Sequence, residues 1–282
     1  MEGRTVSSKG LMNQKQWITH DESQDKSAAL IKRVSLYLLL SPIVVSVILG
    51  VILGLYLVLP VIGFVLGLVL QRAVVSSSRS AFNEVVNSAP ASESLHARVY
   101  NVVDGLCVVS GDQRPALVLI DSAYPVAVAG VDADGSHVIG VSQQFVNVMS
   151  RVEVEAVAAH LLWRLRMGHG RLVAYLYGLS RVLSVVGLGS VVQKIAARAL
   201  PSDLVTIADI AACQATRFPP AAVSALEKCD GSHGSVTLGM GEFLSFALPS
   251  DSQGDAISGQ KVSNLVVSRP LLADRVAILK EM

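Results

Sequence analysis

The longest pattern in the sequence is an uncharged apolar run over residues 34–71. It holds 38 consecutive residues without Asp, Glu, Lys or Arg. As a single helix this run would be about 57 Å long at 1.5 Å per residue, whereas a bilayer core of about 30 Å needs only about 20 residues. The pattern therefore predicts two membrane-spanning helices over residues 34–53 and 56–71, with a turn near Gly54 or before Pro60.

A second apolar stretch, residues 172–192, contains Arg181 and is followed by Lys194 and Arg198. An arginine at the centre of a span costs about 2.5–3.5 kcal/mol on insertion scales. We therefore expect an amphipathic helix on the membrane surface, or a re-entrant hairpin around Gly187 and Gly189, in preference to a simple span.

β-Branched and aliphatic runs separated by turn residues predict a small sheet of three or four strands after a helix over residues 81–101. The turn Asp132-Ala-Asp-Gly135 indicates a hairpin between the last two strands. The expected strands are residues 102–110, 116–120, 126–131 and 137–141.

Helices are predicted in the remaining part. Ser150 and Glu153 form an S-x-x-E capping box, which begins a helix that should run to about Met167. Further helices are expected over residues 203–216 and 220–228 and after Pro270. The fold class is therefore α+β, with an N-terminal transmembrane helical hairpin followed by a domain of mostly helices and a small sheet.

Composition supports a membrane protein. Charged residues make up only 16% of the chain and hydrophobic residues 51%, against about 25% charged in soluble domains. The net charge of +1 gives no electrostatic reason to bind nucleic acid. The three cysteines, Cys107, Cys213 and Cys229, are too scattered for a disulfide framework and fit a reducing compartment.

Basic residues on both sides of the hairpin predict its orientation. Lys26, Lys32 and Arg33 precede it, and Arg72 and Arg79 follow it. Because basic flanks favour the cytoplasmic side, we expect a multi-pass protein of the cell membrane with its N-terminus and globular domain in the cytoplasm. Residues 1–33 are expected to be a mobile tail, residues 34–71 the hairpin and residues 72–282 the domain.

Several phrases in this domain follow a known order. Residues 115–122 read Pro-Ala-Leu-Val-Leu-Ile-Asp-Ser, and residues 125–130 read Pro-Val-Ala-Val-Ala-Gly. Residues 153–164 read Glu-Val-Glu-Ala-Val-Ala-Ala-His-Leu-Leu-Trp-Arg. Later come Val-Thr-Ile-Ala-Asp at 205–209, Ala-Leu-Glu-Lys at 225–228 and Ser-Arg-Pro-Leu-Leu-Ala-Asp-Arg at 268–275.

In order and spacing these phrases resemble the HtpX-like family of membrane zinc metallopeptidases, relatives of the CaaX prenyl-protein endopeptidases. The corresponding family phrases are an N-A-F-A-x-G edge strand, E-x-E-A-V-x-A-H-E-x-x-H, E-x-x-A-D, A-L-E-K and S-H-P-x-x-x-x-R. The resemblance implies a metallopeptidase-like domain on a hydrophobic hairpin.

The resemblance also implies that the chemistry is lost. In H-E-x-x-H, two histidines on one helix face bind zinc and the glutamate activates water. Here the motif positions are His160, Leu161 in place of the base, Arg164 in place of the second histidine, Val205 in place of the glutamate ligand, and the second-shell Asp209. One histidine cannot supply the three protein ligands of a catalytic zinc, so we expect no metal and no cofactor.

The surviving polar residues have two interpretations each. His160 is either a relic ligand or a hydrogen-bonded core histidine. Asp209 and Cys213 could join it around a metal, but these three residue types at this spacing are a weak signal of a metal site. Arg164 either forms an ion pair with Asp209, which would replace the metal as a link between helices, or faces solvent.

Two functions remain. The first is a pseudo-peptidase that binds or regulates another membrane protein, in contact with membrane lipid and not with nucleic acid. Its candidate peptide-binding edge, by strand addition, comprises Val126, Ala127, Val128, Ala129 and Gly130. The second is an active membrane-bound endopeptidase with an unconventional or partner-completed metal site.

Overall fold

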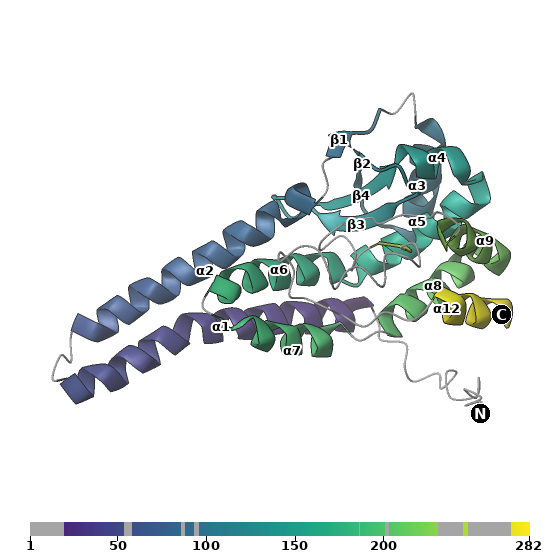
Figure 1. Ribbon diagram of the computed structural model, residues 1–282. Helices are drawn as coiled ribbons and strands as arrows, with labels where there is room; N and C mark the ends of the chain where they lie inside the picture. The colour runs from purple at the N-terminus through teal and green to yellow at the C-terminus, as the bar shows by residue number, and fades with distance from the viewer. Residues whose placement is uncertain are drawn as a thin grey trace.

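The computed structural model describes residues 20–53, 58–85, 88–92, 96–185, 187–200, 203–230, 245–247 and 272–282. Two long helices project from one side of a domain that contains a sheet and several shorter helices (Figure 1). The arrangement is α+β, as the sequence predicts.

The projecting helices are α1, His20–Leu53, and α2, Val58–Val85. Within them, Asp25–Ile52 and Val58–Phe82 are long and apolar enough to cross a bilayer. Only 17% of each most apolar window is buried, whereas the core helix of a soluble protein would be mostly covered. Exposed apolar side chains along both helices, such as Ile52 and Val61 at 70% and 62%, therefore indicate membrane association.

The first helix begins earlier than predicted. Residues 20–33 were expected to belong to a mobile tail, but they are helical and continuous with the apolar part of α1. Leu30 and Ile31 pack against a cluster of buried apolar side chains. This contact explains why the helix does not begin at Val34. Residues 1–19 of the expected tail lie outside the described residues.

The two projecting helices approach each other through glycines. A Cβ atom on Gly67 would lie 2.6 Å from the carbonyl oxygen of Leu39, and one on Gly63 would lie 2.6 Å from that of Pro42. Residues four apart share a helix face, so these positions form a small-xxx-small contact of the kind that lets membrane helices pack closely. The Gln71 side-chain amide also donates to Ser35 Oγ at 2.9 Å.

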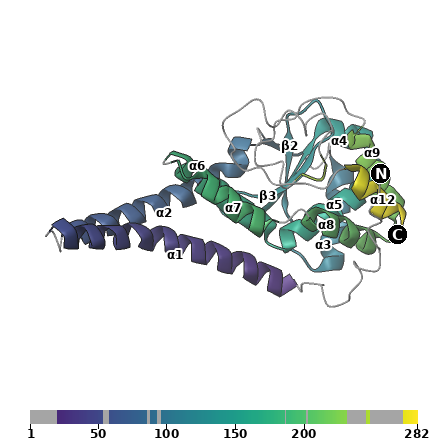
Figure 2. The ribbon, with the colours of Figure 1, turned by 60° about the horizontal axis from the view of Figure 1, so that its bottom comes forward.

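The stretch predicted as a surface helix or re-entrant hairpin forms two helices, α6, His169–Val185, and α7, Gly189–Ala199. The chain turns between them at Gly187, whose φ is 77°. Figure 2 shows α6 and α7 beside the hairpin. Residues Leu172 to Ser180 of α6 are buried, and Gly178 lies against Val74 and Ser78 of α2, so α6 packs against the hairpin.

The sheet has four strands: β1, Ser88–Pro90; β2, Ala116–Ile120; β3, Ala127–Val131; and β4, His137–Ser142. Their order is β1-β2-β4-β3, so β3 is an edge strand. Only β2 and β4 run parallel. The last three strands were predicted from the sequence, as was the turn between β3 and β4.

One predicted strand is a helix. Residues 102–110 belong to α3, Ala97–Ser110, and the expected helix over 81–101 is divided among α2, β1 and α3. The reason is helical spacing, because Val99, Val102, Val103 and Cys107 share one buried face while Val108 and Val109 are exposed.

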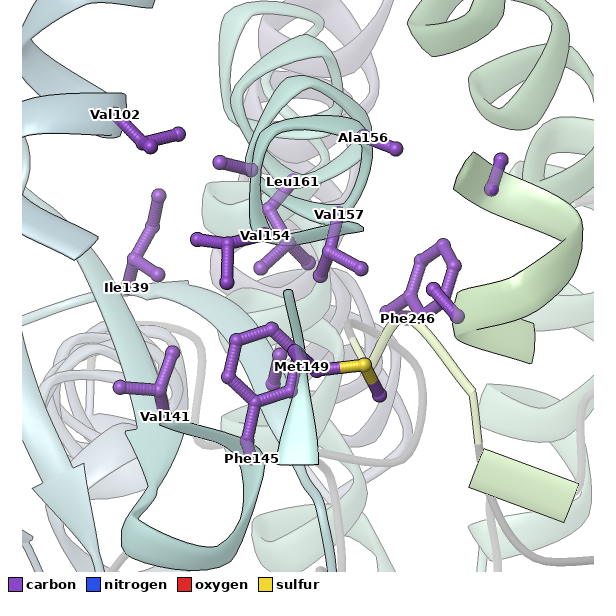
Figure 3. Packing of buried hydrophobic residues seen from close by; sticks show 14 of the residues in the cluster. Val102, Ile139, Val141, Phe145, Met149, Val154, Ala156, Val157, Leu161 and Phe246 are labelled. Carbon is purple, nitrogen blue, oxygen red and sulfur yellow. The ribbon is translucent and has the colours of Figure 1, made fainter. Parts of the chain in front are cut away.

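The remaining described helices are close to their predicted bounds, except α4, Gln143–Val148, which the sequence did not predict. Ser150 caps α5, Arg151–Arg166, and both hydrogen bonds of the capping box with Glu153 are present. The other helices are α8, Asp203–Thr216; α9, Pro219–Asp230; and α12, Leu272–Lys280. The main core surrounds α5 and includes Ile139, Phe145, Leu161 and Phe246 (Figure 3).

Candidate functional site

Helix α5 carries three of the motif positions through the centre of the domain. Contacts with β3, α3, α8 and α9 surround it, and for this reason nearly every side chain in its middle is apolar and buried. His160, Leu161 and Arg164 are at most 3% exposed. The polar groups among them must therefore find partners inside the protein.

His160 faces Asp209 on α8. The His160 Nδ1 and Asp209 Oδ1 atoms lie 2.8 Å apart, although neither ring nitrogen makes a linear hydrogen bond within the described part of the chain. Burial lowers the pKa of His160 to about 4, with Arg164 and Arg275 adding to the effect and Asp209 opposing it. His160 is therefore neutral at pH 7.

Asp209 forms its ion pair with Arg275 of α12. Arg275 Nε donates to Oδ2 at 2.7 Å and Nη2 donates to Oδ1 at 2.8 Å. Burial alone would raise the pKa of Asp209, but Arg275 and His160 lower it to about 2. The predicted pair between Arg164 and Asp209 is therefore wrong, because Arg275 already binds both carboxylate oxygens.

Arg164 is buried, so the alternative that it faces solvent is also wrong. Its Nη1 lies 3.4 Å from the carbonyl oxygen of Ser245 and donates to it. Phe246 follows, with its ring edge against the His160 ring at 5.2 Å between centroids. Arg164 and His160 thus both contact a chain segment that sequence reasoning did not assign to the site.

The motif positions do not fit a catalytic zinc. Leu161 is 1% exposed and lies in the apolar core, and Val205 on α8 is 6% exposed. Neither side chain has an atom that binds a metal or transfers a proton. In the described ranges no group of three or more His, Cys, Asp or Glu side chains could hold a metal ion.

The candidate peptide-binding edge is part of β3 but is not open. Ala127, Val128, Ala129 and Gly130 lie in the strand, and Val126 precedes it with its N–H donating to Ser142 Oγ at 2.9 Å. All five residues are buried. The phenyl ring of Phe82, at the end of α2, lies against Gly130.

A second buried carboxylate ties α5 to α9. Lys228 Nζ lies 2.6 Å from Glu153 Oε2, and Ser224 Oγ donates to Glu153 Oε1 at 2.5 Å. Burial would raise the pKa of Glu153, but these two partners and Ser150 lower it to about 2. The pair holds the first turn of α5 against α9.

Two parts of the site were missed from the sequence. Arg275 belongs to the tail phrase, but that phrase did not indicate which acid it would bind. The segment Ser245–Phe246–Ala247 carries no pattern that would place it beside α5.

Searches with this sequence matched no protein-family model, no curated protein and no solved structure.

Proposed function

We propose that this protein is a membrane-anchored pseudo-peptidase, a degenerate relative of the HtpX-like metallopeptidases that binds or regulates another membrane protein without catalysis. The observation that carries the proposal is that Leu161, Arg164 and Val205 are all buried at the positions where the resemblance expects the general base and two zinc ligands. Asp209 and Arg275, which both match family phrases, form an ion pair that joins α8 to α12 beside His160.

The side chains at the other motif positions support a non-catalytic role. Leu161 cannot act as a general base, and Val205 and Arg164 cannot bind zinc. Arg164 also puts a positive charge close to His160, which would repel a cation. These substitutions remove the metal, the base and the electrostatics of a zinc site together.

The membrane arrangement completes the proposal. Two apolar helices, α1 and α2, anchor the domain, and basic residues flank them at Lys32, Arg33 and Arg72. We therefore place the N-terminus and the domain in the cytoplasm. The proposed partner is another membrane protein whose cytoplasmic segment reaches the domain.

A protease assay on the full chain in lipid nanodiscs tests the proposal. Casein is incubated with the protein with added zinc and with 1,10-phenanthroline, beside a His160→Ala variant. We expect equal background cleavage in all conditions. Zinc-dependent cleavage that the chelator and the His160→Ala change both abolish would overturn the proposal and establish a membrane-bound endopeptidase.

Cross-linking in native membranes tests the binding role. We expect one membrane protein to co-purify with the chain in constant stoichiometry across several mild detergents. If cross-linked chain from native membranes carries no partner at a constant ratio, the binding role is contradicted even where the protein lacks protease activity.

A further inference from the structure

Ser245–Phe246–Ala247 pairs with the edge strand β3 as a bound peptide would. Ser245 and Val128 form an antiparallel β-bridge, and the Phe246 N–H donates to the Ala127 carbonyl oxygen at 2.9 Å. The pairing lies on the side of β3 that β4 leaves open. It is therefore strand addition from within the same chain.

Two arginines hold the backbone of this segment. Arg275 Nη1 donates to the Phe246 carbonyl oxygen at 2.8 Å, and Arg164 Nη1 donates to that of Ser245 at 3.4 Å. Every peptide offers carbonyl oxygens of this kind. These contacts, like the bond to Ala127, would accept any extended chain in the same register.

Selectivity resides in the Phe246 side chain. Its ring is 1% exposed and belongs to the main core with Met149 and Val157 (Figure 3). The His160 ring meets it edge-on, and the Arg275 guanidinium lies 5.4 Å from the centre of its face. A planar apolar ring satisfies both contacts, because a cation is attracted to an aromatic face.

The described contacts of the segment are the bridge to β3 and the two arginine bonds. Helices α5 and α8 contact each other directly. Displacement of the segment would therefore expose β3, Arg164 and Arg275 without separating α5 from α8.

We propose that the β3 edge, with Arg164, Arg275 and the space beside His160 that the Phe246 ring fills, is a binding site for an extended peptide carrying one aromatic residue. Ser245–Phe246–Ala247 is its resident occupant, and a partner's segment binds by displacing it. The inference rests on the proposed function in one respect, that the partner is a protein.

The test uses full-length protein in nanodiscs and a fluorescent peptide, Leu-Ser-Phe-Ala-Leu-Pro, which is the chain's own sequence over residues 244–249. Phe246→Ala removes the resident anchor. We expect it to bind the peptide at least about tenfold more tightly than the wild type, because a buried aromatic ring supplies most of the competing affinity. A peptide with Ala in place of Phe should bind neither protein.

Phe218→Ala is the matched control, since that ring is 49% exposed and lies outside the site. It should bind the peptide as weakly as the wild type. Equal binding by the wild type and Phe246→Ala, or equal binding of the two peptides, would overturn the proposal.

Hydrogen exchange on the wild type gives a second test that needs no variant. The Phe246 amide should exchange through local opening, faster than the Leu161 amide in the middle of α5. Identical, globally limited exchange at both amides would show a permanent structural strand and would overturn the proposal. Neither experiment measures zinc or cleavage, so its failure is distinguishable from failure of the pseudo-peptidase assignment.

Discussion

Arg275 binds both carboxylate oxygens of Asp209, at 2.7 and 2.8 Å, and the two side chains are 3% and 1% exposed. A buried ion pair is stabilising only as a pair, because removal of one partner leaves the other charge uncompensated. The pair also joins the last described helix, α12, to α8 and α5. Loss of the pair should therefore destabilise the domain as a whole.

Arg275→Leu and Asp209→Leu should each lower the free energy of unfolding by about 3–5 kcal/mol. The double variant should recover part of this loss, because no orphan charge remains, although the Phe246 carbonyl still lacks its donor. Thermal or denaturant unfolding in detergent measures the effect. As a control, Glu227→Leu breaks the exposed pair with Lys280 and should cost no more than about 1 kcal/mol. Strictly additive losses at Asp209 and Arg275 would contradict the account.

His160 should make the protein sensitive to mild acid. Its pKa is lowered from 6.5 to about 4 in the folded protein, so between these values the unfolded chain binds a proton that the folded chain does not. The part of the free energy of unfolding that depends on neutral His160 is fully present above pH 6.5. It falls as the pH drops toward 4, by up to about 1.4 kcal/mol per pH unit. Asp209 titrates lower, from 3.8 to about 2, and contributes only below this window.

His160→Gln tests this effect. Unfolding free energies of the wild type and the variant are compared between pH 8 and pH 4.5. The difference between the two proteins should be constant above pH 7 and should change in favour of the variant as the pH falls. Parallel curves over the whole range would show that His160 is not held neutral by burial.

Much of the fold could be predicted because local chemistry agrees with it. The Ser150 and Glu153 capping box fixed the start of α5, and Gly135, with φ of 85°, allowed the turn between β3 and β4. The strand assigned to residues 102–110 failed because a run of β-branched residues also fits a helix when every third or fourth residue is buried. The spacing of Val99, Val103 and Cys107 carried that information.

The candidate site was predictable only in part. The phrase around His160 predicted which motif residues lie on α5. It did not predict which cation pairs with Asp209, because Arg164 and Arg275 both lie near the same buried region. Which of them binds Asp209 depends on how α12 packs, and this is a tertiary property. The pairing of Ser245 with Val128 is likewise a tertiary contact that no local pattern in the sequence indicates.

The contact between α1 and α2 should depend on small residues. Gly67→Ala places a methyl group 2.6 Å from the Leu39 carbonyl oxygen, so the helices must separate, at a cost of about 1–3 kcal/mol. Gly105→Ala is the control, because nothing lies within 4 Å of its added Cβ, and it should stabilise α3 by up to about 1 kcal/mol. Unfolding in mixed micelles measures both. Equal tolerance of the two changes would contradict the packing described.

Orientation can be tested with single cysteines, since Cys107, Cys213 and Cys229 are all buried. Val58→Cys, at the start of α2, and Val109→Cys, on the exposed face of α3, are 57% and 88% exposed in the native residues. A membrane-impermeant maleimide added to intact cells should label Val58→Cys at once and Val109→Cys only after permeabilisation. The opposite pattern would place the domain outside the cell.

The most direct measurement of the central claim is the zinc content of the purified full-length chain after incubation with zinc and gel filtration. The wild type should carry only background zinc. Arg164→His/Val205→Glu, which restores two donors beside His160, should gain zinc toward one per chain and lose it on further change of His160 to Ala. Failure of this variant to gain zinc would contradict the assignment of the motif positions. Stoichiometric zinc in the wild type that disappears in His160→Ala would contradict the pseudo-peptidase account itself.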